Sequence, residues 1–175
     1  MRFICRIKEE MKILFVLVVA MMVGCFGYCQ TAEDYYNMGN AKFKLQDYLG
    51  AIDDYTCAIE INSDYLDCLI MRGNSRDSIE YYNGAISDYT KAIELNPKNA
   101  DYYFYRGSSK EKLQHNNGAI NDFTTAIEIN PNNANYYYKR GLIRASLGQN
   151  VCVDFNKAAR LHHTEAIEFV KKYCN

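Results

Sequence analysis

The sequence predicts an all-α protein, a solenoid of about four antiparallel helix pairs followed by a capping helix. Three observations lead to this fold class. Glycine returns every 34 residues, two alanines and an aromatic residue return at the same interval, and Asn-Ser or Asn-Pro closes each unit. The glycines are Gly39, Gly73, Gly107 and Gly141. A fixed period of this length is typical of arrays in which each unit is a helix, a turn and a second helix.

Each repeated residue has a physical role in such a unit. The glycine lies on the first helix and the alanines on the second, and small side chains let the two helices approach closely. The aromatic residue, Tyr55 in the first unit, fills the space beside them. Proline occurs at the end of the second and third units because it cannot continue the preceding helix. One pair cannot bury its apolar stripe alone, so the units must stack. The alanines are Ala51, Ala85 and Ala119, then Ala58, Ala92 and Ala126.

The boundaries of the units follow from the period. The three equal units are 32–65, 66–99 and 100–133. A degenerate fourth unit, 134–161, has lost two residues, so that Val151 takes the first alanine position, Phe155 the aromatic position and Ala158 the second alanine position. We expect a capping helix over 164–174, with one apolar face that covers the last pair.

The segment AEDYYNMGNAKFKLQDYLGAIDDYTCAIEINS, residues 32–63, resembles the tetratricopeptide repeat (TPR) in its small-residue and aromatic positions. The resemblance covers the three equal units without a gap and extends into the fourth. It implies a right-handed α-solenoid that acts as a scaffold or adaptor. Such a protein binds a peptide or a helix of another protein in its concave groove.

The resemblance also implies which residues line this groove, namely the second, fifth, ninth, twelfth and thirteenth of each unit. We therefore expect peptide binding at Tyr36, Asn40, Phe43, Ile70, Asn74, Phe104, Ser108, Tyr138 and Leu142. Glu33, Asp67 and Asp101 add an acidic edge. Apolar and amide side chains together suit an extended or helical peptide. The alternative is that some of these residues only pack adjacent repeats.

Some co-chaperones of the family bind a terminal Glu-Glu-Val-Asp through Lys, Asn and Arg side chains at five defined positions. The residues at those positions here are Tyr36, Asn40, Met71, Asp101 and Tyr105. Only Asn40 fits, so this carboxylate clamp is absent.

Residues 1–29 are predicted to be a signal peptide, because basic residues precede an uninterrupted apolar run over 13–23. The preferred cleavage lies between Cys29 and Gln30, which predicts a periplasmic or secreted protein. In an alternative interpretation the signal is that of a lipoprotein, and a lipidated Cys25 holds the chain at a membrane. A retained anchor is a further alternative, although the uncharged stretch is short for a span of about 20 residues.

Four cysteines follow the predicted signal peptide. Cys57 and Cys68 are symmetric about one interhelical turn, and Cys152 and Cys174 are symmetric about another. Symmetric positions on antiparallel helices lie at equal height, and exported proteins keep disulfides. We therefore predict the bridges Cys57–Cys68 and Cys152–Cys174, against the alternative that these cysteines are small buried hydrophobic residues.

Basic residues four apart recur on the predicted first helices, and an aspartate precedes each aromatic residue of the second helices. The basic residues are Arg72 and Arg76, Arg106 and Lys110, and Arg140 and Arg144, with Lys42 in the first unit. The aspartates are Asp54, Asp88, Asp122 and Asp154. We expect salt bridges between paired helices; the alternative is a track for an acidic ligand.

Composition and motifs exclude several classes of function. Lys and Arg number 20 against 21 Asp and Glu, so nucleic acid is not expected as a partner. Phosphate-binding loops, metal-ligand motifs and nucleophile elbows are absent from the sequence, so we expect no enzymatic activity, no cofactor, no metal and no small-molecule substrate. The predicted function is an exported scaffold for protein–protein interaction. A holdase-like assembly chaperone for envelope proteins is the alternative, and an enzyme accessory subunit comes last.

Overall fold

The structure, a computed structural model, describes residues 31–174. The predicted signal peptide, its cleavage site at Cys29 and Gln30 and the alternative lipidation site at Cys25 lie outside the described residues. All regular secondary structure within residues 31–174 is α-helical.

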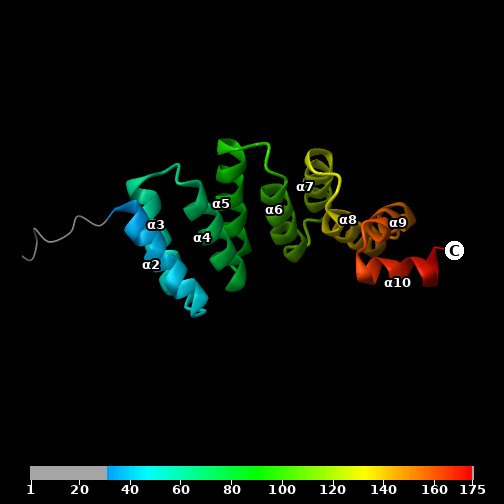
Figure 1. Cartoon of the computed structure of the whole chain (residues 1–175), viewed down its shortest axis with the longest axis horizontal. Coiled ribbons are helices and arrows are strands. Elements are labelled where there is room, and N and C mark those ends of the chain that lie inside the picture. The colour runs from blue at the N-terminus through cyan, green and yellow to red at the C-terminus, as the bar shows by residue number, and fades with distance from the viewer. Residues whose placement is uncertain (1–30, 175) are drawn as a thin grey trace, which may run out of the picture. The chain divides into compact units, whose positions relative to one another are not determined.

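Four consecutive helix pairs and one further helix make up the described part of the chain (Figure 1). The first helices of the pairs are α2 (Ala32–Lys44), α4 (Leu66–Ser78), α6 (Ala100–Lys112) and α8 (Ala134–Ser146). The second helices are α3 (Tyr48–Ile61), α5 (Tyr82–Leu95), α7 (Asn116–Ile129) and α9 (Cys152–Arg160), and α10 (Thr164–Tyr173) follows. Each helix packs mainly against its neighbours in chain order. The predicted all-α solenoid of antiparallel helix pairs is thus confirmed.

The second helices bury the repeated small and aromatic residues completely. The side chains with no exposed surface include Tyr55, Tyr89, Phe123 and Phe155, with the alanines Ala51, Ala58, Ala85, Ala92, Ala119, Ala126 and Ala158. Opposite each ring is the glycine of the first helix. A Cβ atom on Gly73 would lie only 2.6 Å from Cε1 of Tyr89, so the observed approach of the two helices requires glycine there.

The turn within each pair contains one residue with positive φ, always at the same place in the repeat. The residues are Gln46, Glu80 and Gln114 in the first three pairs and Gly148 in the fourth. Only the fourth is a glycine, the residue that adopts this conformation without strain. The sequence does not mark this position as a turn, because three of its four residues are Gln or Glu rather than Gly or Asn, which usually adopt positive φ.

The two-residue deletion shortens α9 at its beginning. This helix has 9 residues, whereas α3, α5 and α7 have 14 each. Val151, expected at the first alanine position, lies at the N-cap of α9. Phe155 and Ala158 keep the buried positions predicted for them, so the register of the repeat is restored after the deletion.

Only one of the two predicted disulfides is present among the described cysteines. Cys152, in the first turn of α9, is bonded to Cys174, which follows α10. The other prediction was wrong, because Cys57 and Cys68 are both free. Cys68 packs in a core cluster with Tyr55. Cys57 lies two residues after Tyr55, roughly 200° further round the helix, and therefore points away from that cluster. Equal height did not bring the two thiols face to face.

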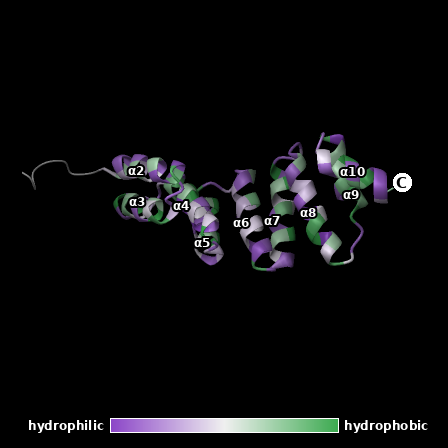
Figure 2. Cartoon of the chain, turned by 90° about the horizontal axis from the view of Figure 1, so that it is seen from below, coloured by the Kyte–Doolittle hydropathy of each residue, from purple (hydrophilic) through white to green (hydrophobic). Residues whose placement is uncertain are grey.

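Hydrophobic and hydrophilic residues alternate around the helices rather than forming continuous apolar segments (Figure 2). No helix in the described part of the chain is both long and apolar enough to cross a bilayer.

Candidate peptide-binding groove

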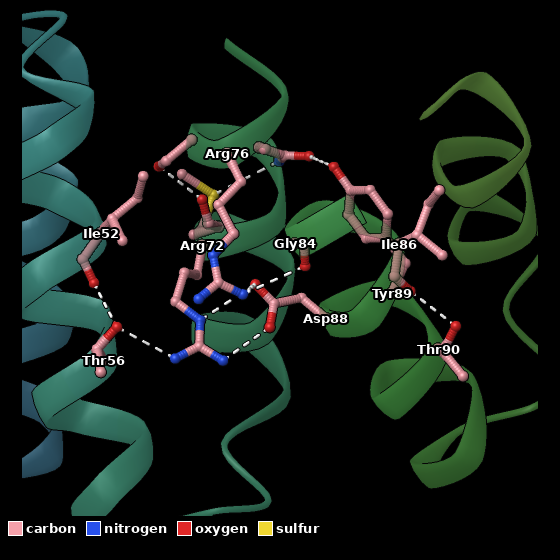
Figure 3. A network of polar contacts seen from close by, with 12 residues as sticks. Ile52, Thr56, Arg72, Arg76, Gly84, Ile86, Asp88, Tyr89 and Thr90 are labelled. Carbon is pink, nitrogen blue, oxygen red and sulfur yellow. Dashed lines mark hydrogen bonds and ion pairs between the residues drawn. The ribbon is translucent and has the colours of Figure 1, made fainter. Parts of the chain in front are cut away.

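A repeated set of ion pairs fixes the first helices relative to the second helices (Figure 3). Arg72 Nη2 lies 2.7 Å from Asp88 Oδ1, and Arg76 Nη1 lies 2.7 Å from Asp88 Oδ2. We call this set the Arg–Asp ladder. Its other members are Arg106 and Lys110 on Asp122, Arg140 and Arg144 on Asp154, and Lys42 on Asp54. The predicted salt bridges between paired helices are confirmed.

The ladder also joins neighbouring pairs. Arg72 Nη1 donates a hydrogen bond of 3.1 Å to Oγ1 of Thr56 on the preceding second helix, and Thr56 donates in turn to the carbonyl oxygen of Ile52 at 2.7 Å. The same link recurs from Arg106 to Thr90 and from Arg140 to Thr124. Because the protein itself neutralises these cations, the structure favours the structural interpretation of the basic row over a track for an acidic ligand.

Several residues predicted to line the groove are instead used for packing. Phe104 lies against Tyr136 of the next pair, with ring centroids 5.2 Å apart. Tyr138 stacks on His163, which precedes α10, at 4.0 Å. Phe43 packs into the first core cluster. At these three positions the alternative expectation holds, because the side chains pack against other parts of the fold.

The predicted amide residues are partly engaged inside their own pairs. Asn40 Oδ1 accepts a hydrogen bond of 2.8 Å from the hydroxyl of Tyr55, and Asn74 Oδ1 accepts one of the same length from Tyr89. Both oxygens thus satisfy buried tyrosine hydroxyls, which need a partner. Leu142 is 36% exposed and has no such role.

The remaining predicted residues line two hollows between successive first helices. One, which we call the Tyr–Asp hollow, has a volume of about 200 Å³ and draws residues from α2, α4 and α6 and from the N-cap of α6. Its lining residues are Tyr36, Asp67, Ile70, Met71, Asn99, Asp101, Tyr102 and Tyr105. Tyr36 and Ile70 were predicted as site residues, whereas Met71, Tyr102 and Tyr105 were not. They occupy the third and sixth positions of their units, outside the set that the resemblance assigns to the groove.

Burial and charge both act on the tyrosines of this hollow. The pKa of Tyr105 is raised, first by burial and then by the negative charge of Asp101. The pKa of Tyr102 is also raised, first by burial and further by the charges of Asp67 and Asp101. A hydrogen bond with Asn99 acts in the opposite direction and lowers it. These tyrosines therefore stay neutral and keep their hydroxyl protons, so the hollow presents aromatic rings, hydroxyl groups and two carboxylates.

The second hollow, of about 260 Å³, is lined by Asp77 and by the predicted residue Ser108, among others. Asp77 accepts hydrogen bonds from Ser109 Oγ on the next first helix, at 2.8 and 2.9 Å, and from the hydroxyl of Tyr89 at 3.1 Å. Burial raises the pKa of Asp77 above its ordinary value of 3.8, although these hydrogen bonds and the charge of Lys112 oppose the shift. This carboxylate links two repeats but is costly to ionise there.

The raised pKa predicts how stability depends on pH at this position. The folded state binds a proton at Asp77 more tightly than the unfolded state does. As pH falls through the folded pKa toward 3.8, protonation of Asp77 therefore favours folding. At pH values above the folded pKa, the ionised carboxylate opposes folding. In Asp77→Asn the side chain is neutral at every pH. We expect the difference in urea midpoint, variant minus parent, to be largest at neutral pH and to decrease as the pH falls.

The measurement is a series of urea denaturation curves at several pH values for the parent and Asp77→Asn. Asp67→Asn is the control for loss of one carboxylate from the same helix. If this difference in urea midpoint instead increased as the pH fell, the assignment would be contradicted.

No group of acidic, histidine or cysteine side chains within residues 31–174 is arranged to hold a metal ion. The candidate site is the Tyr–Asp hollow, lined by side chains of successive first helices.

Comparisons with known proteins agree with this architecture. A family model described as "Tetratricopeptide repeat" matches residues 32–65, and one described as "TPR repeat" matches residues 80–114 and 112–148. No curated protein is similar enough in sequence to count as a match.

Several solved structures share the fold. "Crystal structure of MamA protein" is 26% identical in sequence, with 75% of this chain and 73% of that chain covered and a TM-score of 0.72. "First TPR of Spaghetti (RPAP3) bound to HSP90 peptide SRMEEVD" is 26% identical, with 70% and 97% covered and a TM-score of 0.65. The Arabidopsis OM64 TPR domain is 27% identical, with 65% and 94% covered and a TM-score of 0.62.

The two family models together match more than half of the 175 residues, and the helix pairs recur at the period that the sequence predicts. The chain therefore belongs to the tetratricopeptide-repeat family.

Proposed function

We propose that this protein is an exported TPR scaffold that binds a peptide or a helix of a partner protein on the face formed by its first helices. The observation that carries the proposal is the Tyr–Asp hollow, to which three successive repeats contribute. A surface shared by several repeats suits an elongated ligand better than a compact one. The hollow offers aromatic and apolar contact area together with a few polar groups, a combination common at peptide-binding sites.

A solved relative supports this use of the fold, because the RPAP3 domain named above is bound to a peptide of another protein. That peptide, SRMEEVD, ends in acidic residues. The five positions expected to bind such an end hold Tyr36, Asn40, Met71, Asp101 and Tyr105 here. The partner proposed for this protein is accordingly another protein with a different recognition sequence. Catalysis and the binding of nucleic acid or a small molecule form no part of the proposal.

Export is supported by two features of the chain. The apolar run over 13–23 follows basic residues, as in secretory signals. The Cys152–Cys174 disulfide suits an oxidising compartment such as the periplasm or the cell exterior. The intact mass of the protein isolated from its source cell tests this part of the proposal. A chain that begins at Gln30, or at a lipidated Cys25, would support export, whereas an unprocessed and fully reduced chain would refute it.

The binding function is tested by capture of partners from an envelope extract of the source cell. The bait is residues 30–175, which contain every helix described above; the chain from Ala32 onward forms one compact unit. We expect one dominant partner, and we expect Ile70→Ala combined with Tyr105→Ala to lose it. These two side chains line the hollow and are only half-buried, so circular dichroism should show a folded variant.

The matched control combines Val153→Ala with Tyr173→Ala. Both residues are apolar and exposed, at 71% and 59%, and neither lines the hollow. Retention of the partner by the folded Ile70 and Tyr105 variant would place the binding surface elsewhere. Weak capture of many denatured proteins, in place of one partner, would favour the holdase-like chaperone.

A further inference from the structure

The two carboxylates of the Tyr–Asp hollow have no cation to balance them inside the described part of the protein. Asp67 and Asp101 are both exposed, and neither forms an ion pair with any residue of 31–174. No Lys, Arg or His side chain is among the described residues that line the hollow. The hollow therefore carries an excess of negative charge.

The Arg–Asp ladder explains why this charge remains unbalanced. The Arg side chains nearest in sequence, Arg72 and Arg106, make bidentate hydrogen bonds with Asp88 and Asp122 on the second helices. Each also donates to a threonine of the preceding second helix. Their guanidinium groups are thus committed to the second helices and do not neutralise carboxylates in the hollow.

The polar groups around the carboxylates are arranged to receive a donor. Asp101 Oδ1 accepts a hydrogen bond from the hydroxyl of Tyr136, while Oδ2 accepts none from the described residues. The hydroxyls of Tyr36 and Tyr105 likewise form no hydrogen bond with residues 31–174, although both rings are half-buried. The hollow therefore combines open carboxylate oxygens with tyrosine rings and hydroxyl groups.

The volume of the hollow limits what can enter it. About 200 Å³ is less than the roughly 300–1,000 Å³ typical of pockets for drug-sized ligands. It therefore suits a single side chain of a longer segment rather than a whole small molecule. The rest of that segment would lie along the first helices.

From these observations we propose that the Tyr–Asp hollow selects an arginine side chain carried by a basic, extended segment of the partner protein. This inference rests on the proposed function and specifies the chemistry of the partner. A guanidinium group is planar, donates to carboxylates and stacks on aromatic rings, so it uses both kinds of group found here. Lysine offers only a point charge and fits less well.

The selectivity is opposite to that expected for an acidic peptide end. Asp101 occupies one of the five positions at which the clamp of acid-binding relatives has a cation or an amide, and the other four hold no cation. A carboxylate there repels an acidic ligand and attracts a basic one. Charge complementarity of this kind determines partner choice more than total affinity.

Three fluorescein-labelled peptides test the inference by fluorescence anisotropy with residues 30–175. The first alternates Arg and Leu, the second replaces each Arg by citrulline, and the third replaces each Arg by Glu. Citrulline keeps the shape of arginine and removes its charge. We expect the Arg peptide to bind about tenfold more tightly than the citrulline peptide, as one or more charge-assisted hydrogen bonds would give. The Glu peptide should bind more weakly still, and added salt should reduce the differences.

A pair of matched variants locates the effect. Asp67→Asn with Asp101→Asn removes two charges from the hollow while nearly preserving side-chain shape, and should abolish the preference for Arg over citrulline. Glu94→Gln with Glu128→Gln removes the same number of charges from exposed positions of α5 and α7, and should leave the preference within about twofold of the parent. If the double Asn variant does not fold, Asp67→Asn alone, at an exposed position, should lose part of the preference.

Three results would overturn the inference: equal binding of the Arg and citrulline peptides, an unchanged preference in the Asn variants, or no binding of the Arg peptide. Its failure can be separated from failure of the proposed function. A cellular partner that is lost with Ile70→Ala and Tyr105→Ala but retained by the double Asn variant would leave the peptide-binding scaffold in place and remove only the arginine selectivity.

Discussion

Replacing Asp88 by alanine is expected to lower the free energy of unfolding by about 3–5 kcal/mol, because it leaves two largely buried guanidinium groups without their anionic partner. The side chain of Asp88 is only 3% exposed, and those of Arg72 and Arg76 are 13% and 18% exposed. Asp88 also holds Arg72, which joins two repeats through its hydrogen bond to Thr56 of the preceding pair. A loss of this size is a large share of the roughly 5–15 kcal/mol that stabilises a typical domain.

Urea denaturation of residues 30–175, followed by circular dichroism, measures this effect as a shift in midpoint at a given slope. Two further aspartates provide matched comparisons. Asp54→Ala removes a carboxylate that, within residues 31–174, forms an ion pair only with Lys42, whose side chain is 36% exposed, and should cost about 1 kcal/mol. Asp64→Ala breaks an exposed pair with Lys91 at 3.6 Å and should change stability by less than about 0.5 kcal/mol. A cost for Asp88→Ala no greater than that for Asp64→Ala would show that the ladder does not stabilise the fold.

Gly73→Ala is expected to destabilise the protein by about 2 kcal/mol, although alanine is the better helix former by about 1 kcal/mol. The added Cβ would lie 2.6 Å from Cε1 and 2.9 Å from Cζ of Tyr89. The ring cannot withdraw easily, because its hydroxyl is hydrogen-bonded to Asn74 at 2.8 Å and to Asp77 at 3.1 Å. Either the helices must separate or these bonds must break.

The repeat supplies a graded series for this prediction. The nearest ring atom would lie 2.9 Å from a Cβ on Gly107 and 3.2 Å from one on Gly141, so the cost should fall in the order 73, 107, 141. Gly118→Ala is the control, since its Cβ would meet only the flexible side chain of Lys110 at 3.2 Å, and should stabilise the protein by up to about 1 kcal/mol. Thermal or urea unfolding of the four variants checks the order. A cost at Gly141 that exceeds the cost at Gly73 would contradict the steric explanation.

The predicted groove shows where reasoning from the repeat was insufficient. Tyr36, Ile70, Phe104 and Tyr138 occupy the same position of their units, yet only the first two line the Tyr–Asp hollow. Tyr36 packs against a ring as well, but Phe104 and Tyr138 are taken up by their ring contacts and do not reach the hollow. The difference depends on the residue that the next repeat places opposite. Tyr136 covers Phe104, and His163 covers Tyr138. A position in the repeat fixes the direction of a side chain but not what meets it.

The sequence alone determined the helix pairs, their period, the buried alanines and aromatic rings, and the partners in the Arg–Asp ladder. Each of these depends on spacing within one unit or on its exact repetition, and spacing is what a sequence records. Only the tertiary structure decided that Cys57 and Cys68 stay apart, that Asn40 and Asn74 turn toward buried hydroxyls, and that Asp67 and Asp101 share one hollow with unpaired charge. These features depend on the angle at which neighbouring helices meet and on the size of the side chains between them. Both are set by packing across repeats, where no single unit of the sequence contains the information.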